Sequence, residues 1–272
     1  MKKYLTKTLL LIAFWPGFWP GAGVAEPLPT VLDQNGVVLL GEVHDNPHHH
    51  AVQSEMLTRI APKAVVFEML TPEQASRVTP ELRGNRAALE AALGWSDSGW
   101  PDFAMYYPLF ATAPGAVIYG AQLPRGEARK AMSQGVATYF GPRAGAFGLD
   151  TPLAPDEQSA REEYQHLAHC EAMPEEMLAG MVDLQRLRDA MLARAVVDAL
   201  AETGGPVAVI TGNGHARRDW GVPVYLQRVL PGVMIHALGQ SEDGNGPEGR
   251  FDALRDSPAA ERPDPCEAFR KS

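Results

Sequence analysis

Five short apolar runs along the chain predict buried parallel strands. The runs are continuous rather than alternating, which is typical of strands covered by helices on both faces of a sheet. They are Val37–Leu40, Ala64–Phe67, Ala116–Gly120, Val207–Thr211 and Val233–Ala237. Segments of helical spacing separate the runs. The alternation of strand and helix therefore predicts an α/β fold with a mainly parallel open sheet and flanking helices.

Helices are predicted between these strands. Thr71 is an expected N-cap with Pro72 at the first helical position. The expected helices are His48–Ile60, Pro72–Leu93, Glu127–Met132 and Ala216–Leu230. The tail after Gly239 is rich in Gly, Pro, Asp and Glu, which predicts irregular structure there.

Residues 150–205 interrupt the alternation because they contain no strand candidate. Pro174 opens a long helical pattern, and Gly204 ends it. Met177, Met181 and Leu184 recur at helical spacing, which indicates a packed helix face. We expect an inserted helical subdomain, about 150–205, that could cover the carboxyl edge of the sheet.

Residues 1–25 carry the pattern of a secretory signal peptide. Lysines precede the apolar run Leu5–Trp15, and the small residues Gly23 and Ala25 precede a predicted cleavage before Glu26. The run is too short to span a bilayer, and no later run predicts a transmembrane segment. There is no cysteine near the predicted cleavage site, so we expect no lipid anchor. We expect residues 26–272 to form one soluble domain that is periplasmic or secreted.

The charge and the cysteines narrow the function further. Removal of residues 1–25 takes away three lysines and no acid, which moves the formal charge from −9 to −12. This acidity disfavours binding to nucleic acid and to anionic membranes. The two cysteines, Cys170 and Cys266, lack the spacing of a structural zinc site. In an exported chain they predict a disulfide.

Titratable residues stand directly after three of the predicted strands. Glu42 and His44 follow the first strand, Glu68 follows the second, and His215 follows the fourth after a Gly-Asn-Gly turn that includes Asn213. The carboxyl ends of parallel strands share one edge of a sheet, where open α/β folds bind ligands. These side chains are expected to line one pocket. The competing interpretation is that they cap helices and form ordinary ion pairs.

Two further groups of residues are candidates for ligand contacts. The run His48-His49-His50 resembles a metal cluster, but consecutive helical residues point in different directions, so we favour His50 alone. An aromatic segment that we expect to be a loop contains Tyr106 and Tyr107 between Trp100 and Phe110. Its phenol oxygens could ligate haem iron. The alternative is an aromatic loop packed on the sheet edge.

Several separate motifs resemble the ChaN type of iron-regulated haem-binding proteins, some of which are lipoproteins. The resemblance runs in order through Gly41-Glu42-Val43-His44-Asp45-Asn46-Pro47, His49-His50, Gln53, Phe67-Glu68-Met69, Trp100-Pro101…Tyr106…Pro108, His169-Cys170, Gln185…Arg188-Asp189, Gly212-Asn213-Gly214-His215 and Asp264-Pro265-Cys266-Glu267. It covers nearly the whole expected mature chain.

The resemblance implies a haem-binding α/β protein that serves haem or iron uptake, with a tyrosine ligand and paired haems between two subunits in some members. It places Tyr106 as the favoured ligand of the haem iron, with Tyr107 and Tyr139 as alternatives. It places Glu42, His44, Glu68 and His215 at the pocket edge. An enzyme remains the competing hypothesis. A metal-dependent or His/Glu hydrolase, esterase-like or protease-like, would use the same four residues for acid–base catalysis or metal binding.

Overall fold

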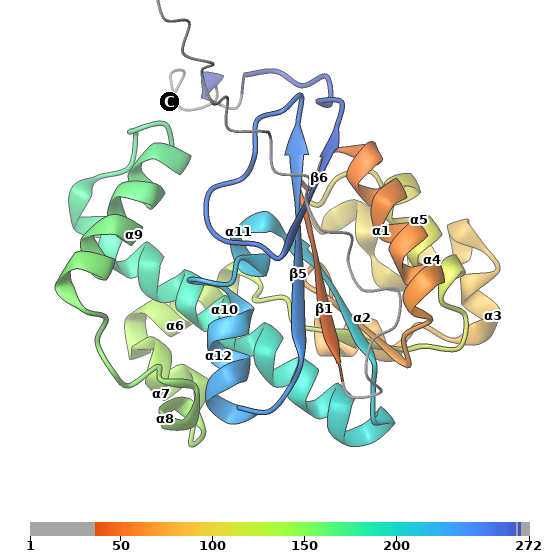
Figure 1. Ribbon diagram of the computed structural model, residues 1–272, viewed down its shortest axis with the longest axis horizontal. Helices are drawn as coiled ribbons and strands as arrows, with labels where there is room; N and C mark the ends of the chain where they lie inside the picture. The colour runs from red at the N-terminus through yellow and green to blue at the C-terminus, as the bar shows by residue number, and fades with distance from the viewer. Residues whose placement is uncertain (1–35, 265, 268–272) are drawn as a thin grey trace, which may run out of the picture.

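Six parallel strands form one open sheet in the order β3-β2-β4-β1-β5-β6. The computed structural model describes residues 36–264 and 266–267, shown in Figure 1. The strands are β1 (Val37–Glu42), β2 (Ala64–Phe67), β3 (Val117–Gly120), β4 (Val207–Gly212), β5 (Ile235–Glu242) and β6 (Ala253–Ser257). The α/β fold with a parallel sheet is confirmed. The predicted signal peptide, residues 1–25, lies outside the described residues.

Helices cover both faces of the sheet (Figure 1). One face carries α1 (Pro47–Ile60), α2 (Pro72–Ser76), α4 (Arg86–Leu93), the 3₁₀ turn η1 (Trp95–Asp97) and α5 (Phe103–Thr112), with α3 (Pro80–Arg83) beside α4. The other face carries α6 (Arg125–Gln134), α7 (Val136–Phe140), α8 (Ala144–Phe147), α10 (Glu175–Thr203) and α12 (Val222–Val229). Two further helices are α9 (Pro155–Ala168), which packs on α10, and α11 (Asn213–Ala216), which follows β4.

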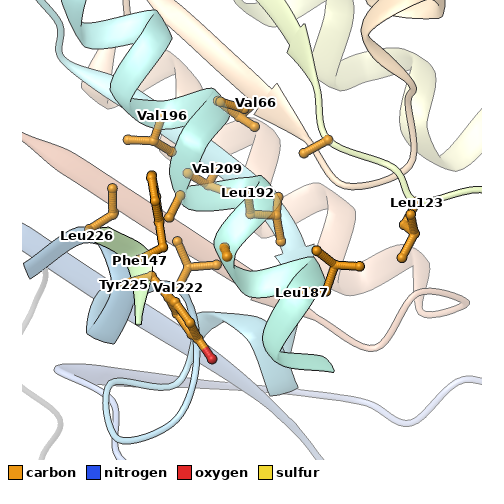
Figure 2. Packing of buried hydrophobic residues seen from close by; sticks show 14 of the residues in the cluster. Val66, Leu123, Phe147, Leu187, Leu192, Val196, Val209, Val222, Tyr225 and Leu226 are labelled. Carbon is orange, nitrogen blue, oxygen red and sulfur yellow. The ribbon is translucent and has the colours of Figure 1, made fainter. Parts of the chain in front are cut away.

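The strands supply side chains to two hydrophobic cores because successive residues of a strand point to opposite faces. Val37 and Leu39 of β1 join the core under α10 and α12, whereas Val38 and Leu40 join the core under α1 and α5. Figure 2 shows the first core, in which residues of α10, α12 and the strands interdigitate. Burial on both faces explains why the strand sequences are continuously apolar.

The helical segment predicted for residues 150–205 is present as α9 and α10. The long helix α10 packs on the sheet, and its residues Leu187 and Val196 lie in the same core as β1 and β4. Gly204 ends this helix in a left-handed conformation, as predicted from the sequence. The first half of α10 extends toward the carboxyl edge of the sheet, where Gln185 and Arg188 line a cleft.

Three secondary-structure predictions were wrong. The expected helix Pro72–Leu93 is three helices, because Thr79 and Asn85 each start a new one. The expected helix Ala216–Leu230 is interrupted and divides into α11 and α12. The aromatic segment expected as a loop contains the helix α5, which tolerates Pro108 in its interior.

A fourth prediction was wrong in the tail after Gly239. β5 continues to Glu242, and the edge strand β6 pairs with it in parallel. The middle residues of β6 are exposed and largely polar, so they lack the apolar run that identifies a buried strand.

The predicted disulfide is confirmed. Cys170 and Cys266 are bonded, with their Cα atoms 5.5 Å apart, across a sequence separation of 96 residues. The bond attaches the C-terminal segment to the turn that follows α9. Among the helices of the described residues, none is long and apolar enough to cross a membrane.

Candidate functional site

The carboxyl ends of β1, β2 and β4 bring four predicted site residues together. Glu42 is the last residue of β1, and His44 follows it by two positions. Glu68 follows β2, and His215 lies in α11 directly after β4. β4 lies between β1 and β2 in the sheet, so the three strand ends are neighbours although they are far apart in the sequence.

Glu68 is the centre of the cluster. Its Oε2 accepts hydrogen bonds from the Thr211 hydroxyl at 2.6 Å and the Gly212 amide at 2.8 Å. Its Oε1 faces the Nε2 atoms of His215 and His44, at 3.6 and 4.0 Å. Burial opposes ionisation of Glu68, but the two imidazoles and the two hydrogen bonds outweigh it, so the pKa of this carboxyl falls to about 2.

His44 is held by a second carboxylate. Its Nδ1 lies 2.7 Å from Oε1 of Glu42, and the other oxygen of Glu42 accepts from the Gln53 amide at 2.6 Å. Burial disfavours the imidazolium, but the charges of Glu68 and Glu42 prevail and raise the pKa of His44 to about 9. Burial also opposes the charge on Glu42, yet hydrogen bonding and attraction to His44 hold the pKa of Glu42 below its usual value. The pair is therefore ionic at neutral pH.

His215 is held in the same way by a residue that the sequence analysis did not select. Nδ1 of His215 lies 2.7 Å from a carboxylate oxygen of Asp189, which projects from the buried side of α10. Burial lowers the tendency of His215 to be charged, but Glu68 and Asp189 outweigh it and raise the pKa of His215. Burial raises the pKa of Asp189. The resemblance motif Gln185…Arg188-Asp189 was the one available signal for this residue.

The cluster thus consists of two histidine–carboxylate pairs that face one common carboxylate. Such pairs orient an imidazole and fix which nitrogen carries the proton, both at metal sites and in acid–base catalysis. Within the described part of the chain, no group of three or more His, Cys, Asp or Glu residues is arranged to hold a metal ion. The arrangement orients two imidazoles toward one carboxylate.

Tyr106 and Tyr107 lie on α5, outside the open part of the site. The Tyr106 side chain is fully buried, and its hydroxyl donates to Glu42 at 2.7 Å. Burial and the negative charge of Glu42 raise the pKa of Tyr106, so the phenol is neutral. The Tyr107 hydroxyl donates to the backbone oxygen of Arg83 at 2.9 Å. Neither residue lines the cleft described below, and iron ligation by either stays a prediction.

His50 and Asn213 also point away from open solvent. His50 is buried, with Nε2 2.9 Å from the His44 backbone oxygen and Nδ1 3.4 Å from Glu42. The side chain of Asn213 exchanges two hydrogen bonds with the backbone of Gln240, both 2.9 Å long, and so connects α11 to β5. His50 contacts His44 and Glu42, and Asn213 fixes α11 to β5, so both residues support the cluster on its buried side.

A wide cleft of about 960 Å³ opens over this cluster. His44, Glu68 and His215 reach it, and the His44 side chain remains 32% exposed. The Trp100 ring lies 4.9 Å from the His44 ring and forms part of the cleft wall. Further lining comes from η1, from the segment after β3 and from α10, namely Asp97, Gly99, Gln122, Arg125, Gln185, Arg188 and Leu192.

Comparisons with known proteins give a family match and similar folds. A family model described as "Haem-binding uptake, Tiki superfamily, ChaN" matches residues 28–226. The solved structure of cofacial haem binding to ChaN of Campylobacter jejuni is similar over 80% of this chain and 86% of that chain, with a TM-score of 0.61 and 21% identity. The type III effector HopBA1 is similar over 83% of this chain and 89% of that chain, with a TM-score of 0.45 and 12% identity.

A search of curated protein sequences gives no match. The likeness to Campylobacter ChaN concerns the fold, whereas the family model matches most of the sequence itself. The matched residues include Glu42, His44, Glu68, Asp189 and His215, that is, the whole cluster at the carboxyl edge. This chain therefore belongs to the ChaN family of haem-binding uptake proteins within the Tiki superfamily.

Proposed function

We propose that this protein binds haem in the wide cleft over Glu68, and that it serves haem or iron uptake. The observation that carries the proposal is the cleft itself, because its floor presents an imidazole beside a flat aromatic ring. Ligand pockets usually measure ~300–1,000 Å³, and this cleft, with about 960 Å³, lies at the upper end of that range, as a large planar ligand requires. Membership of a haem-binding family and the cofacial haem binding of Campylobacter ChaN support the same conclusion.

The side chains around the cleft fit the chemistry of haem. Once it loses its proton, His44 offers an imidazole nitrogen for iron, and Trp100 offers a face against which a porphyrin can stack. Arg188 lines the cleft, its Nη1 donates to the amide oxygen of Gln185, and no carboxylate of the described residues lies within ion-pair distance of it. A guanidinium without a carboxylate partner suits a haem propionate. When bound, haem would supply an iron centre that a side chain of the cleft could ligate.

The proposal assigns different roles to His44 and Tyr106. His44 is the residue of this pair that reaches the cleft, so we propose it as the side chain closest to the iron. Tyr106 acts beneath it, since its hydroxyl donates to the Glu42 oxygen that also contacts Nδ1 of His44. The sequence-based prediction of Tyr106 as ligand is the competing assignment. It requires the phenol to leave a fully buried position.

Export and dimer formation belong to the same proposal. The Cys170–Cys266 disulfide supports a location in an oxidising compartment, in agreement with the predicted signal peptide. We therefore propose a periplasmic or secreted protein. A homodimer that pairs two haems is proposed from the resemblance, and the width of the open cleft supports it.

The test is a titration of the purified mature protein with haemin, read in the Soret band. We expect saturable binding at micromolar concentration, and a Trp100→Ala variant that binds about tenfold more weakly because it loses the stacking face. Arg143→Met is the matched control, since Arg143 is half-exposed and lies on Phe147, away from the cleft. A linear, unsaturable response, or equal binding by Trp100→Ala and wild type, would contradict the proposal.

A second candidate function is hydrolysis, and the His215–Asp189 pair favours it. An imidazole that is oriented by a buried carboxylate and opens on a cleft is the arrangement of a general base. Chromogenic esters and peptides should then be hydrolysed by the wild type and not by His215→Ala. Repeating the assay with added divalent metal and with a chelator separates a metal-dependent hydrolase from an acid–base one. Absence of turnover in all conditions removes this candidate.

A further inference from the structure

A second, smaller pocket lies behind His215, between α9, α10 and the segment after α11. It has a volume of about 70 Å³ and shares only His215 and Gln185 with the wide cleft. Its lining is polar and aromatic and comprises Arg161, Tyr164, Gln165, Val182, Gln185, Asp189, Gly214, His215, Arg217 and Trp220. The roles given above to His44, Glu68 and Trp100 do not involve this pocket.

Two polar side chains in its wall carry groups that have no hydrogen-bond partner within the described residues. Gln165 is 4% exposed, and its side-chain amide makes no hydrogen bond with any described residue. Arg217 is 5% exposed, and its Nη1 has no hydrogen-bond partner within the described chain. Buried polar groups are almost always paired, so the unpaired Nη1 of Arg217, together with the pocket-lining Gln165, points to a polar ligand.

Two guanidinium groups set the sign of that ligand's charge. Arg217 and Arg161 pack on the Trp220 ring, with their Cζ atoms 3.9 and 5.1 Å from its centre. Asp219 and Glu157 contact Nε and Nη2 of these arginines and leave the Nη1 edges without a carboxylate. Guanidinium edges of this kind are suited to an anionic oxygen.

The remaining charges limit the anion to a singly charged one. Asp189 is the one carboxylate in the lining, and it is paired with His215 at 2.7 Å. Its charge would repel a phosphate dianion more strongly than a carboxylate. The Trp220 and Tyr164 rings lie edge to face, 6.1 Å apart, and provide an apolar wall for a short carbon chain.

We infer that this pocket is a carboxylate-binding subsite, with Arg161, Gln165 and Arg217 as its recognition groups. The carboxylate has two possible sources, and for the first of them the inference rests on the proposed haem binding. The first source is a propionate of haem that reaches past Gln185 and His215 from the wide cleft. The second is a free small organic acid that binds independently of haem.

The experiment compares haemin with its dimethyl ester, in which both propionates are blocked, at the same low detergent concentration. Each is titrated into the wild type, Gln165→Leu, Arg161→Met and the control Arg143→Met. Arg161→Met keeps an apolar stem against Trp220 and removes the charge. Calorimetric titrations with propionate and with benzoate test the free-acid source. Thermal melts confirm that each variant is folded, and the comparison of the two haemins in the wild type needs no variant.

With haem as the source, we expect the wild type to bind haemin at least about tenfold more tightly than the ester, since a hydrogen bond to a charged group contributes about 1.5–3 kcal/mol. This preference should be lost in Gln165→Leu and Arg161→Met and kept in Arg143→Met. With a free acid as the source, propionate or benzoate should bind saturably to the wild type and the control, and not to the other two variants.

The inference is overturned if the preference for haemin persists unchanged in Gln165→Leu and Arg161→Met and no free acid binds, because the propionates are then held elsewhere. It is overturned equally if haemin and the ester bind alike and no free acid binds. If the wild type binds no haemin but binds a free acid saturably, the proposed haem function is refuted and this subsite is supported.

Discussion

Glu68 lies between two imidazoles, and each imidazole is oriented by a carboxylate of its own. Three acids, Glu42, Glu68 and Asp189, and two histidines therefore share a small, mostly buried volume. Buried charges are tolerated because every one of them has an opposite charge or a hydrogen-bond donor beside it. Such a network responds to pH as a unit, and His44 is its most exposed member.

The stability of the fold should fall as His44 loses its proton. Its pKa is raised from 6.5 to about 9 in the folded protein, so the ion pair contributes fully below pH 6.5 and is lost as the pH rises through 9. Urea unfolding at pH 6 and at pH 9.5 measures this loss. His44→Gln should lose less stability than the wild type over the same interval, and an equal loss in both proteins would show that His44 is not the titrating group.

Sequence reasoning located most of this cluster because strand ends are recognisable. Glu42 and Glu68 each stand at the end of an apolar run, so a charged residue directly follows the residues of a buried strand. This change from apolar to charged residues can be seen in the sequence. Asp189 gave no such contrast, because an acid in the middle of a long helix is most often solvated. Tyr106 was selected from the family resemblance, but only the three-dimensional structure shows that its hydroxyl donates to Glu42.

At the scale of elements, the turn after β4 holds the two halves of the cluster together. The backbone amide of Gly212 donates to Glu68, and the same residue passes close to His44. A Cβ at Gly212 would lie 3.0 Å from Nε2 of His44, which is tighter than most real contacts. Close approach is thus the reason for glycine here. Its backbone angles are ordinary, with φ near −60°.

A methyl group at this position should disturb the site more than the fold. Gly212→Ala is expected to displace His44, to weaken haemin binding about tenfold and to change stability by only about 1 kcal/mol. Gly214→Ala is the matched control, because its Cβ would meet only the Tyr164 hydroxyl at 3.9 Å, and alanine suits a helix better than glycine. Equal haemin affinity in the two variants would refute this account of Gly212.

The disulfide joins the turn after α9 to the C-terminal segment. Closing a loop of this size restricts the unfolded chain, and removing a native disulfide costs about 2–5 kcal/mol. A Cys170→Ser/Cys266→Ser variant should therefore melt at a lower temperature than the wild type, while haemin binding to the folded variant is retained. An unchanged melting temperature would contradict the prediction.

The elements that sequence reasoning missed are those whose signals are local and weak. β6 is an edge strand with exposed central residues, so its sequence reads as a polar tail. The division of Pro72–Leu93 into three helices depends on the N-caps Thr79 and Asn85, which interrupt an otherwise helical pattern. The continuously apolar strands β1, β2 and β4 were predictable because burial on both faces leaves no polar positions.

At the scale of the whole molecule, the strand order converts distant sequence motifs into one site. β4 is inserted between β1 and β2, so a residue near position 215 reaches residues near positions 42 and 68. The wide cleft opens where these ends meet, with α10 on one side and the segment around Trp100 on the other. The fold class followed from the sequence pattern, whereas the width of the cleft and the second pocket required the packing of α9 and α10.

The most direct test of the account is a haemin titration of the wild type, His44→Ala and Tyr106→Phe, followed by absorption and electron paramagnetic resonance spectra at pH 7 and pH 9. We expect saturable binding by the wild type. The spectrum should show a stronger ligand field at pH 9, because metal binding by His44 requires loss of its proton. His44→Ala should alter the spectrum, whereas Tyr106→Phe should leave it nearly unchanged. A phenolate-type spectrum that His44→Ala preserves and Tyr106→Phe abolishes would contradict the account.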